Sequence, residues 1–125
     1  MGISLGQRTF NFGLKTNVSN ADAVESAIAS HADFMKNHHS LDDSKIHLEH
    51  YYVSKADEMN DPTDPSKGTT GNVVYSINEV YVHAEGIGQH MEAAMAWDGI
   101  GPFMELLGTY GEVIIGNGEV IHTLS

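Results

Sequence analysis

Histidine is the side chain in this sequence that is best suited to exchange a proton near neutral pH. Eight histidines occur among the 125 residues. His31 lies within an apolar stripe at helical spacing, and His50 lies within a segment of alternating apolar and polar residues. A histidine in such a position is either a hydrogen-bonded core residue or a group that binds the polar end of a ligand. Both interpretations of His31 and His50 remain open.

The histidines form no recognisable metal-binding motif. His83, Glu85 and His90 come closest, but zinc or iron needs three or four converging ligands, and no H-E-x-x-H signature is present. His38 and His39 come at the end of an expected helix, where they would stabilise the helix C-terminus. We therefore predict no metal ion and no cofactor, and we assign no catalytic residue.

A second chemical signal is a set of tyrosine, methionine and other aromatic side chains able to enclose an apolar space. Methionine adapts its shape, and aromatic residues predominate in binding pockets. With a few hydroxyl and imidazole groups, such a space suits a flat or elongated molecule with one polar end, such as a fatty-acid-like or polyketide-like compound. The alternative is that these side chains only fill the core. The residues predicted to bind the ligand are His31, Met35, His50, Tyr52, Tyr75, Tyr81, Met91, Met95, Trp97 and Phe103.

Composition argues against several other functions. Acidic residues outnumber basic residues 17 to 6, the formal net charge is −11, and no basic cluster is present, so we expect no binding to nucleic acid. No window approaches the roughly 20 apolar residues of a membrane span, so we expect no membrane association. The N-terminus does not resemble a secretory signal, and cysteine is absent. We expect a cytoplasmic protein.

The segment 72–83, NVVYSINEVYVH, is the strand around which the chain is organised. It is rich in β-branched and aromatic residues, and both of its faces carry apolar side chains, so we expect a central strand covered on both sides. Ser19 and Asp22 form a capping box that predicts the start of a helix. The expected strands are 8–16, 46–54, 72–83, 112–115 and 119–124, the last two joined by an Asn-Gly turn at 116–118, and the expected helices are 19–38, 86–97 and 102–107.

The segment 55–71 is predicted to be a long acidic loop. It holds Pro62 and Pro65, four acidic residues and no periodicity. Loops of this length within a compact domain are uncommon and are usually functional or mobile. Residues 1–7 are predicted to be an N-terminal tail.

The order of these elements predicts an α+β fold of the split β-α-β type. A βαββαβ chain with a short C-terminal strand forms an antiparallel sheet with the helices on one face. We expect a single domain over residues 1–125. The uncovered face of the sheet is too apolar to lie in water, and a second copy of the chain is the simplest cover. The expected oligomer is a homodimer.

This pattern resembles the dimeric α+β barrel superfamily. The stretches that carry the resemblance are RTFNFGLKT, KIHLEHYYVS, NVVYSINEVYVH and the interrupted helix QHMEAAMAW-DGIGPFMELL. The superfamily consists of ferredoxin-like domains whose sheets pack face to face, and it includes antibiotic-biosynthesis-type monooxygenases and small-molecule-binding proteins. The resemblance implies a ligand cavity between the helices and the concave face of the sheet. No catalytic motif of the family is present to assign roles to individual residues.

Three functions are compatible with these observations. The first is a homodimeric binding protein that holds a hydrophobic or amphipathic molecule between helices and sheet. The second is a cofactor-independent monooxygenase in which a tyrosine or histidine deprotonates an electron-rich aromatic substrate, with a haem-binding protein as a related variant. The third is a structural oligomerisation domain without a ligand.

Overall fold

The computed structural model describes residues 2–124. Short 3₁₀ turns at Val18–Asn20 and Pro65–Lys67 accompany the regular elements. The α-helices and strands of these residues are β1 (Arg8–Asn17), α1 (Ala21–His38), β2 (His39–Ser40), β3 (Ile46–Met59), β4 (Thr69–Tyr81), α2 (Gly86–Met95), α3 (Ile100–Tyr110) and β5 (Gly111–Glu119).

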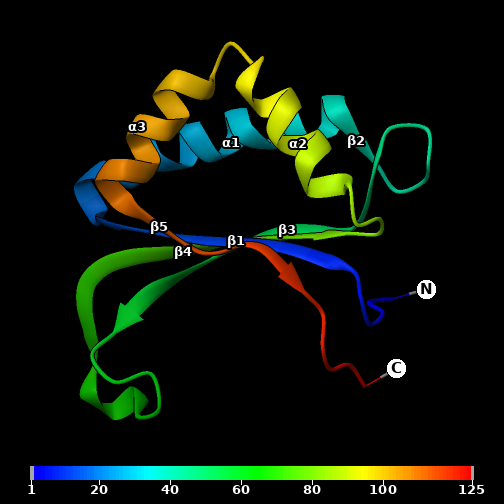
Figure 1. Ribbon diagram of the computed structural model, residues 1–125. Coiled ribbons are helices and arrows are strands. Elements are labelled where there is room, and N and C mark those ends of the chain that lie inside the picture. The colour runs from blue at the N-terminus through cyan, green and yellow to red at the C-terminus, as the bar shows by residue number, and fades with distance from the viewer. Residues whose placement is uncertain (1, 125) are drawn as a thin grey trace.

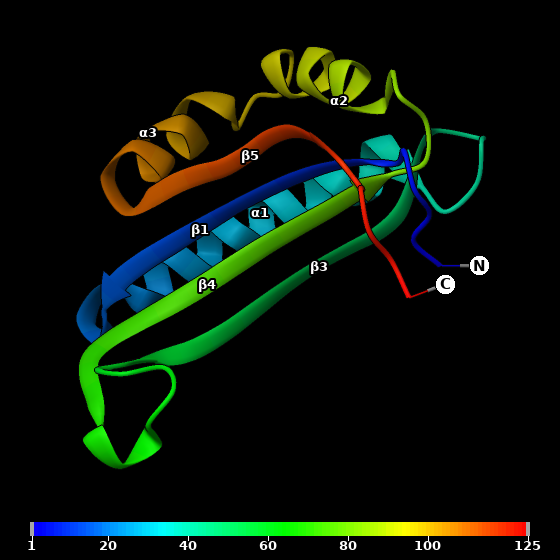
Figure 2. The same ribbon diagram turned by 60° about the horizontal axis from the view of Figure 1, so that its bottom comes forward.

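The described strands form one sheet in the order β2-β3-β4-β1-β5. Strand β4 lies between β3 and β1 and pairs antiparallel with both, and β5 pairs antiparallel with β1 (Figure 2). Helices α1, α2 and α3 all cover the same face of this sheet (Figure 1). The split β-α-β architecture and the central positions of β1 and β4 are therefore confirmed. None of the helices within residues 2–124 is both long enough and apolar enough to cross a membrane.

The pleat of β4 sorts its side chains between the two faces of the sheet. Val73, Tyr75, Ile77, Glu79 and Tyr81 alternate along the strand and are buried beneath the helices. The side chains between them point to the opposite face, which we call the open face. There the Asn11 side-chain amide donates to the Asn78 side-chain oxygen over 2.9 Å.

Two clusters of buried side chains make up the core between sheet and helices. Phe12, Ile77 and Phe103 belong to the first cluster, which lies under α1 and α3. Met35 and Tyr81 belong to the second cluster, which lies under α1 and α2. Partly buried Phe10 and Trp97 pack against both clusters. The candidate site described below lies where the clusters meet.

Helix α1 begins differently from the prediction. The Ser19–Asp22 capping box does not form, because Asn17 caps the preceding 3₁₀ turn by accepting from the backbone N–H of Asn20 and from the Ser19 hydroxyl. The C-terminus agrees with the prediction for His39, whose backbone N–H and Nδ1 both lie against the Met35 carbonyl.

The predicted loop 55–71 is shorter in the structure. Strand β3 continues to Met59 and β4 begins at Thr69, so the connection covers only residues 60–68. Polar pairing supports these strand ends: Glu58 forms an ion pair with Lys15 and accepts hydrogen bonds from Thr70 and Asn72. Interactions of this kind between side chains of different strands stabilise a sheet without any apolar alternation.

The predicted C-terminal hairpin is wrong. Gly116, Asn117 and Gly118 form no turn between two strands and instead continue β5, which pairs with β1 through an irregular register. Gly118 lies so close to β1 that a Cβ atom there would meet the Thr9 hydroxyl at 2.7 Å. The glycine thus serves a close approach between strands rather than a turn.

Candidate functional site

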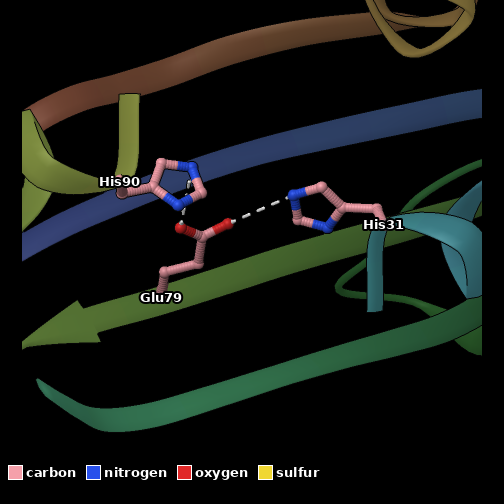
Figure 3. A group of neighbouring side chains, drawn as sticks. All are labelled: His31, Glu79 and His90. Atoms are coloured by element: carbon pink, nitrogen blue, oxygen red, sulfur yellow. Dashed lines mark ion pairs between the residues drawn. The ribbon is translucent and has the colours of Figure 1, made fainter. Parts of the chain in front are cut away.

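Three titratable side chains from three elements converge between sheet and helices. Glu79 points from β4 toward the helices, His31 comes from α1 and His90 from α2 (Figure 3). The His31 Nε2 atom lies 3.9 Å from Glu79 Oε2, and His90 Nε2 lies 3.7 Å from Glu79 Oε1. All three residues are buried. We call this cluster the Glu79 centre.

The Glu79 carboxyl group is only partly satisfied by hydrogen bonds. The Tyr81 hydroxyl donates to Glu79 Oε1 over 2.5 Å, because the period of two in β4 places both side chains on the same face. Within the described residues, Glu79 Oε2 has no hydrogen-bond partner. A buried carboxyl oxygen left in this state is costly, and native structures usually satisfy it. This atom is therefore a candidate binding point for a ligand proton.

A chain of hydrogen bonds fixes the tautomer of His90. The Met35 carbonyl can only accept, so His39 Nδ1, at 2.9 Å from it, carries the proton. Neutral His39 then accepts at Nε2, which lies 3.0 Å from His90 Nδ1, so His90 carries its proton on Nδ1. The remaining nitrogen of neutral His90, Nε2, therefore turns a lone pair toward Glu79.

His31 is held in place by packing as well as by a polar contact. Its ring stacks on Phe103 with centroids 4.6 Å apart and planes inclined by 12°. Its Nδ1 atom lies 3.4 Å from the Tyr51 hydroxyl. Its Nε2 atom remains on the side of Glu79 Oε2.

Burial shifts the pKa of the Glu79 carboxyl group and the pKa values of the two imidazole groups in opposite directions. It raises the pKa of Glu79 to about 7, although the hydrogen bond from Tyr81 acts against this shift. It lowers the pKa of His31 to about 4 and that of His90 to about 3, since neither ring gains a charged hydrogen-bond partner. Burial also raises the pKa of Tyr81, which therefore stays a donor. The group that exchanges a proton near neutral pH is thus the carboxyl group and not an imidazole.

A narrow apolar cavity borders the Glu79 centre. Its volume is about 50 Å³, and aromatic rings together with His31 and His90 form its walls. Met91 and Met104, which are 42% and 54% exposed, also line it. Pockets for drug-sized ligands measure roughly 300–1,000 Å³. A fatty-acid-like or polyketide-like molecule therefore fits only if the flexible side chains of these two methionines move aside.

A wider open groove lies on the other side of Trp97. It has a volume of about 620 Å³, and its walls come from α2 and from the segment 43–46. Trp97 lines both this groove and the narrow cavity. The two spaces therefore share one side chain.

The structure gathers part of the predicted ligand-binding set. His31, Met91, Trp97 and Phe103 line the narrow cavity, and Tyr81 reaches the centre through Glu79.

The other predicted ligand-binding residues lie elsewhere. Met35 is buried in the core under α1 and α2, and Met95 is 67% exposed on α2. The Tyr75 hydroxyl donates a hydrogen bond to the Glu25 carboxylate over 2.8 Å. His50 and Tyr52 pair with Val80 and Asn78 of β4 and so lie on the open face, away from the cavity.

A β-bulge explains the positions of His50 and Tyr52. The sequence alternation places both residues on the same face as Leu48. The register between β3 and β4 shifts between Leu48 and His50, so Leu48 pairs with Tyr81 and is buried beneath the helices. An extra residue in one strand moves every following side chain of that strand to the opposite face of the sheet.

The sequence grouping of His83, Glu85 and His90 is not a cluster in space. His90 is buried in the Glu79 centre, whereas His83 is exposed and contacts Asp43. The described residues contain two other groups of three whose ligand atoms lie within 4.8 Å of one another and could hold a metal ion. These are the Glu79 centre itself and the set Asp43, His47 and His83.

The sequence pattern did not identify Glu79, His39 or His90 as ligand-binding residues. Glu79 gave a usable signal, since a carboxylate between Ile77 and Tyr81 on the buried face of a central strand must find a partner. No comparable signal distinguishes His39 or His90, because their contact depends on how α1 and α2 pack.

Comparison with known proteins shows the fold. No protein-family model matches the chain, and no curated protein matches it. Among solved structures, it is similar to SnoaB, a cofactor-independent oxygenase from Streptomyces nogalater, with 15% sequence identity and a TM-score of 0.50. The match covers 97% of this chain and 98% of SnoaB. The ferredoxin-like α+β fold expected from the sequence is thereby confirmed.

Proposed function

We propose that this chain is an acid–base enzyme that removes a proton from a small, flat, apolar molecule bound beneath α2 and α3. The observation that carries the proposal is Glu79, a buried carboxyl group with one unpaired oxygen and a pKa of about 7. A general base is most effective when its pKa lies near the working pH. The adjoining cavity, whose walls include His31 and His90 of the centre, would hold the substrate ring once Met91 and Met104 move aside.

The reaction that we favour is oxidation by dioxygen without a cofactor. Loss of a proton from an anthrone-like phenol leaves a carbanion that can transfer electrons to dioxygen. The substrate methylene becomes a carbonyl group, one oxygen atom enters the product, and the other leaves as water with the two hydrogens. The similarity of the fold to that of a cofactor-independent oxygenase supports this choice.

Each side chain of the Glu79 centre would have a distinct role. Glu79 would accept the substrate proton at Oε2. His31 and His90 would stay neutral and offer their Nε2 atoms to the polar end of the substrate, which fits their low pKa values. Tyr81 would stabilise the carboxylate that forms when the proton leaves again.

We further propose that the chain works as a homodimer whose open sheet faces pack together. Tyr52 is 56% exposed there, and Val74 of β4 and Val82, just after the end of β4, are half-buried. Exposed apolar surface of this kind usually marks an interface.

Oxygen uptake with anthrone tests the reaction. We expect turnover by the natural chain and a loss of at least about 100-fold in Glu79→Gln, the usual size of a general-base contribution. Glu105→Gln, an exposed change on α3, is the matched control. An unchanged rate in Glu79→Gln would contradict the assignment of the base.

A binding protein without catalysis is the second candidate, supported by the cavity itself. Trp97 is the single tryptophan of the sequence and lines the cavity, so its fluorescence reports ligand binding directly. Saturable quenching by anthrone without oxygen uptake would favour this second function.

A further inference from the structure

We propose that Asp43, His47 and His83 form a binding site for a divalent transition-metal ion such as Zn²⁺, separate from the Glu79 centre. Asp43 Oδ1 accepts from both rings, at 2.8 Å from His47 Nδ1 and 2.7 Å from His83 Nε2. The two rings are 5.5 Å apart, centroid to centroid. Two imidazoles and one carboxylate are a ligand set typical of zinc.

Three separate segments bring these ligands together. Asp43 lies in the connection between β2 and β3, His47 lies near the start of β3, and His83 follows the end of β4. The backbone N–H of Val82 donates to the His47 carbonyl over 3.1 Å, which holds the last two segments side by side. The Ser40 hydroxyl accepts from the Lys45 backbone N–H, which fixes the connection that carries Asp43.

The three ligand atoms lie within 4.8 Å of one another, so they must adjust their spacing to accept an ion. Zinc bonds to nitrogen and oxygen of about 2.0–2.1 Å place neighbouring ligand atoms about 3.3 Å apart in a tetrahedral site. Asp43, with a side chain 76% exposed, can retract by the half ångström that is needed. Each neutral ring would carry its proton on the other nitrogen and give its lone pair to the metal. The solvent side would leave a coordination position for water and a route of access.

Charge also favours a cation at this place. The formal net charge of the chain is −11, and Glu85 is near enough to act on His83 together with Asp43. The Glu79 centre is less suited, since aromatic rings lock its histidines at 3.7 and 3.9 Å from the carboxylate. An ion entering the Glu79 centre would also have to give up its hydration shell in a site that is buried away from solvent.

The bound ion would tie the β2–β3 connection to the end of β4. Asp43, Ser44 and Lys45 from this connection form one wall of the open groove of about 620 Å³ beside Trp97. Metal binding would therefore keep this wall of the groove in place.

Calorimetric titration of Zn²⁺ into the full chain after dialysis against EDTA tests the proposal. We expect one ion per chain, with at least about tenfold weaker binding in His83→Gln and in Asp43→Asn. His50→Gln, which changes an exposed histidine on the open face, is the matched control and should bind as the natural chain does. The visible spectrum of bound Co²⁺ reports whether the ligands are tetrahedral.

Two results of the binding measurements would overturn the proposal. One is the absence of Zn²⁺ binding to the natural chain. The other is binding that survives His83→Gln but is lost in Glu79→Gln, because the ion would then lie in the Glu79 centre. Trypsin cleavage after Lys45 is an independent measurement, and Zn²⁺ should slow it in the natural chain but not in His83→Gln. Equal cleavage rates with and without Zn²⁺ in the natural chain would also contradict the site.

Discussion

The Nε2 atom of His39 lies 3.0 Å from Nδ1 of His90, and this contact determines which nitrogen of His90 faces Glu79. His39 is itself oriented by the Met35 carbonyl at the end of α1. A helix C-terminus therefore controls, through one intervening ring, the lone pair beside the buried carboxylate. His39 is a positioning residue in this arrangement, and His90 is the group that faces the cavity.

The first prediction concerns the tautomer of His90. Nitrogen NMR of the natural chain should show His39 and His90 both protonated on Nδ1. His39→Leu removes the acceptor for His90 Nδ1–H, so the Nε2–H tautomer, which can donate to Glu79, should become populated. His38→Leu, a change at the exposed neighbouring position, should leave His90 unaffected. A natural chain with His90 protonated on Nε2 would contradict the proposed chain of hydrogen bonds from Met35 through His39 to His90.

The second prediction concerns the pH dependence of stability. The pKa of Glu79 is raised from 4.5 to about 7 by burial, so between these pH values the folded chain holds a proton that the unfolded chain has lost. The free energy of unfolding contributed by Glu79 therefore falls as pH rises through this window. Glu79→Gln stays neutral and should match the natural chain below pH 4.5. Above pH 7 the variant should be more stable by about 3 kcal/mol.

Urea unfolding of both proteins from pH 4.5 to 8 provides the measurement. The histidines act with the opposite sign. Burial lowers the pKa of His31 and His39 to about 4 and of His90 to about 3, so their contributions fall as pH drops below 6.5. Taking the difference between the two proteins removes this shared background. A difference that does not change with pH would show that Glu79 is not a perturbed acid.

The third prediction concerns the dimer. A lysine at position 52 would place a charge on the open face that we propose to be buried between two copies. Tyr52→Lys should therefore shift the sedimentation coefficient from dimer to monomer. Met95→Lys introduces the same charge at a position of α2 that is 67% exposed and should leave the dimer intact. A natural chain that sediments as a monomer would contradict the proposed assembly.

Most strand segments followed from side-chain periodicity, and the central positions of β1 and β4 followed from the split β-α-β order of the elements. Valine, isoleucine and tyrosine at every second position from Val73 onward specify a buried face whatever the rest of the chain does. The extension of β3 to Met59 was not predictable in this way. The polar residues there are stabilised by Lys15 and Thr70 from other strands, and such pairs leave no pattern within one segment.

The candidate site was only half visible in the sequence, for two physical reasons. The bulge after Leu48 reversed the facing of His50 and Tyr52, and a bulge of one residue has no composition of its own. The convergence of His31, Glu79 and His90 depends on the packing of α1 and α2 over β4, a tertiary property. The only local signal of this convergence was Glu79, a carboxylate on the buried face of a central strand.

The fourth prediction concerns the wall between cavity and groove. A Cβ atom on Gly99 would lie 2.4 Å from Cζ2 and 2.6 Å from Cε2 of Trp97, so Gly99→Ala must displace the indole. We expect a loss of about 1–3 kcal/mol in the free energy of unfolding and a changed Trp97 fluorescence spectrum. Because Trp97 lines both spaces, quenching by anthrone should weaken as well.

Gly101→Ala is the matched control, since a Cβ atom there meets nothing within 4 Å and the residue lies in α3. That variant should be stabilised by up to about 1 kcal/mol and keep its fluorescence. Equal behaviour of the two variants would mean that the indole does not occupy the position described for it.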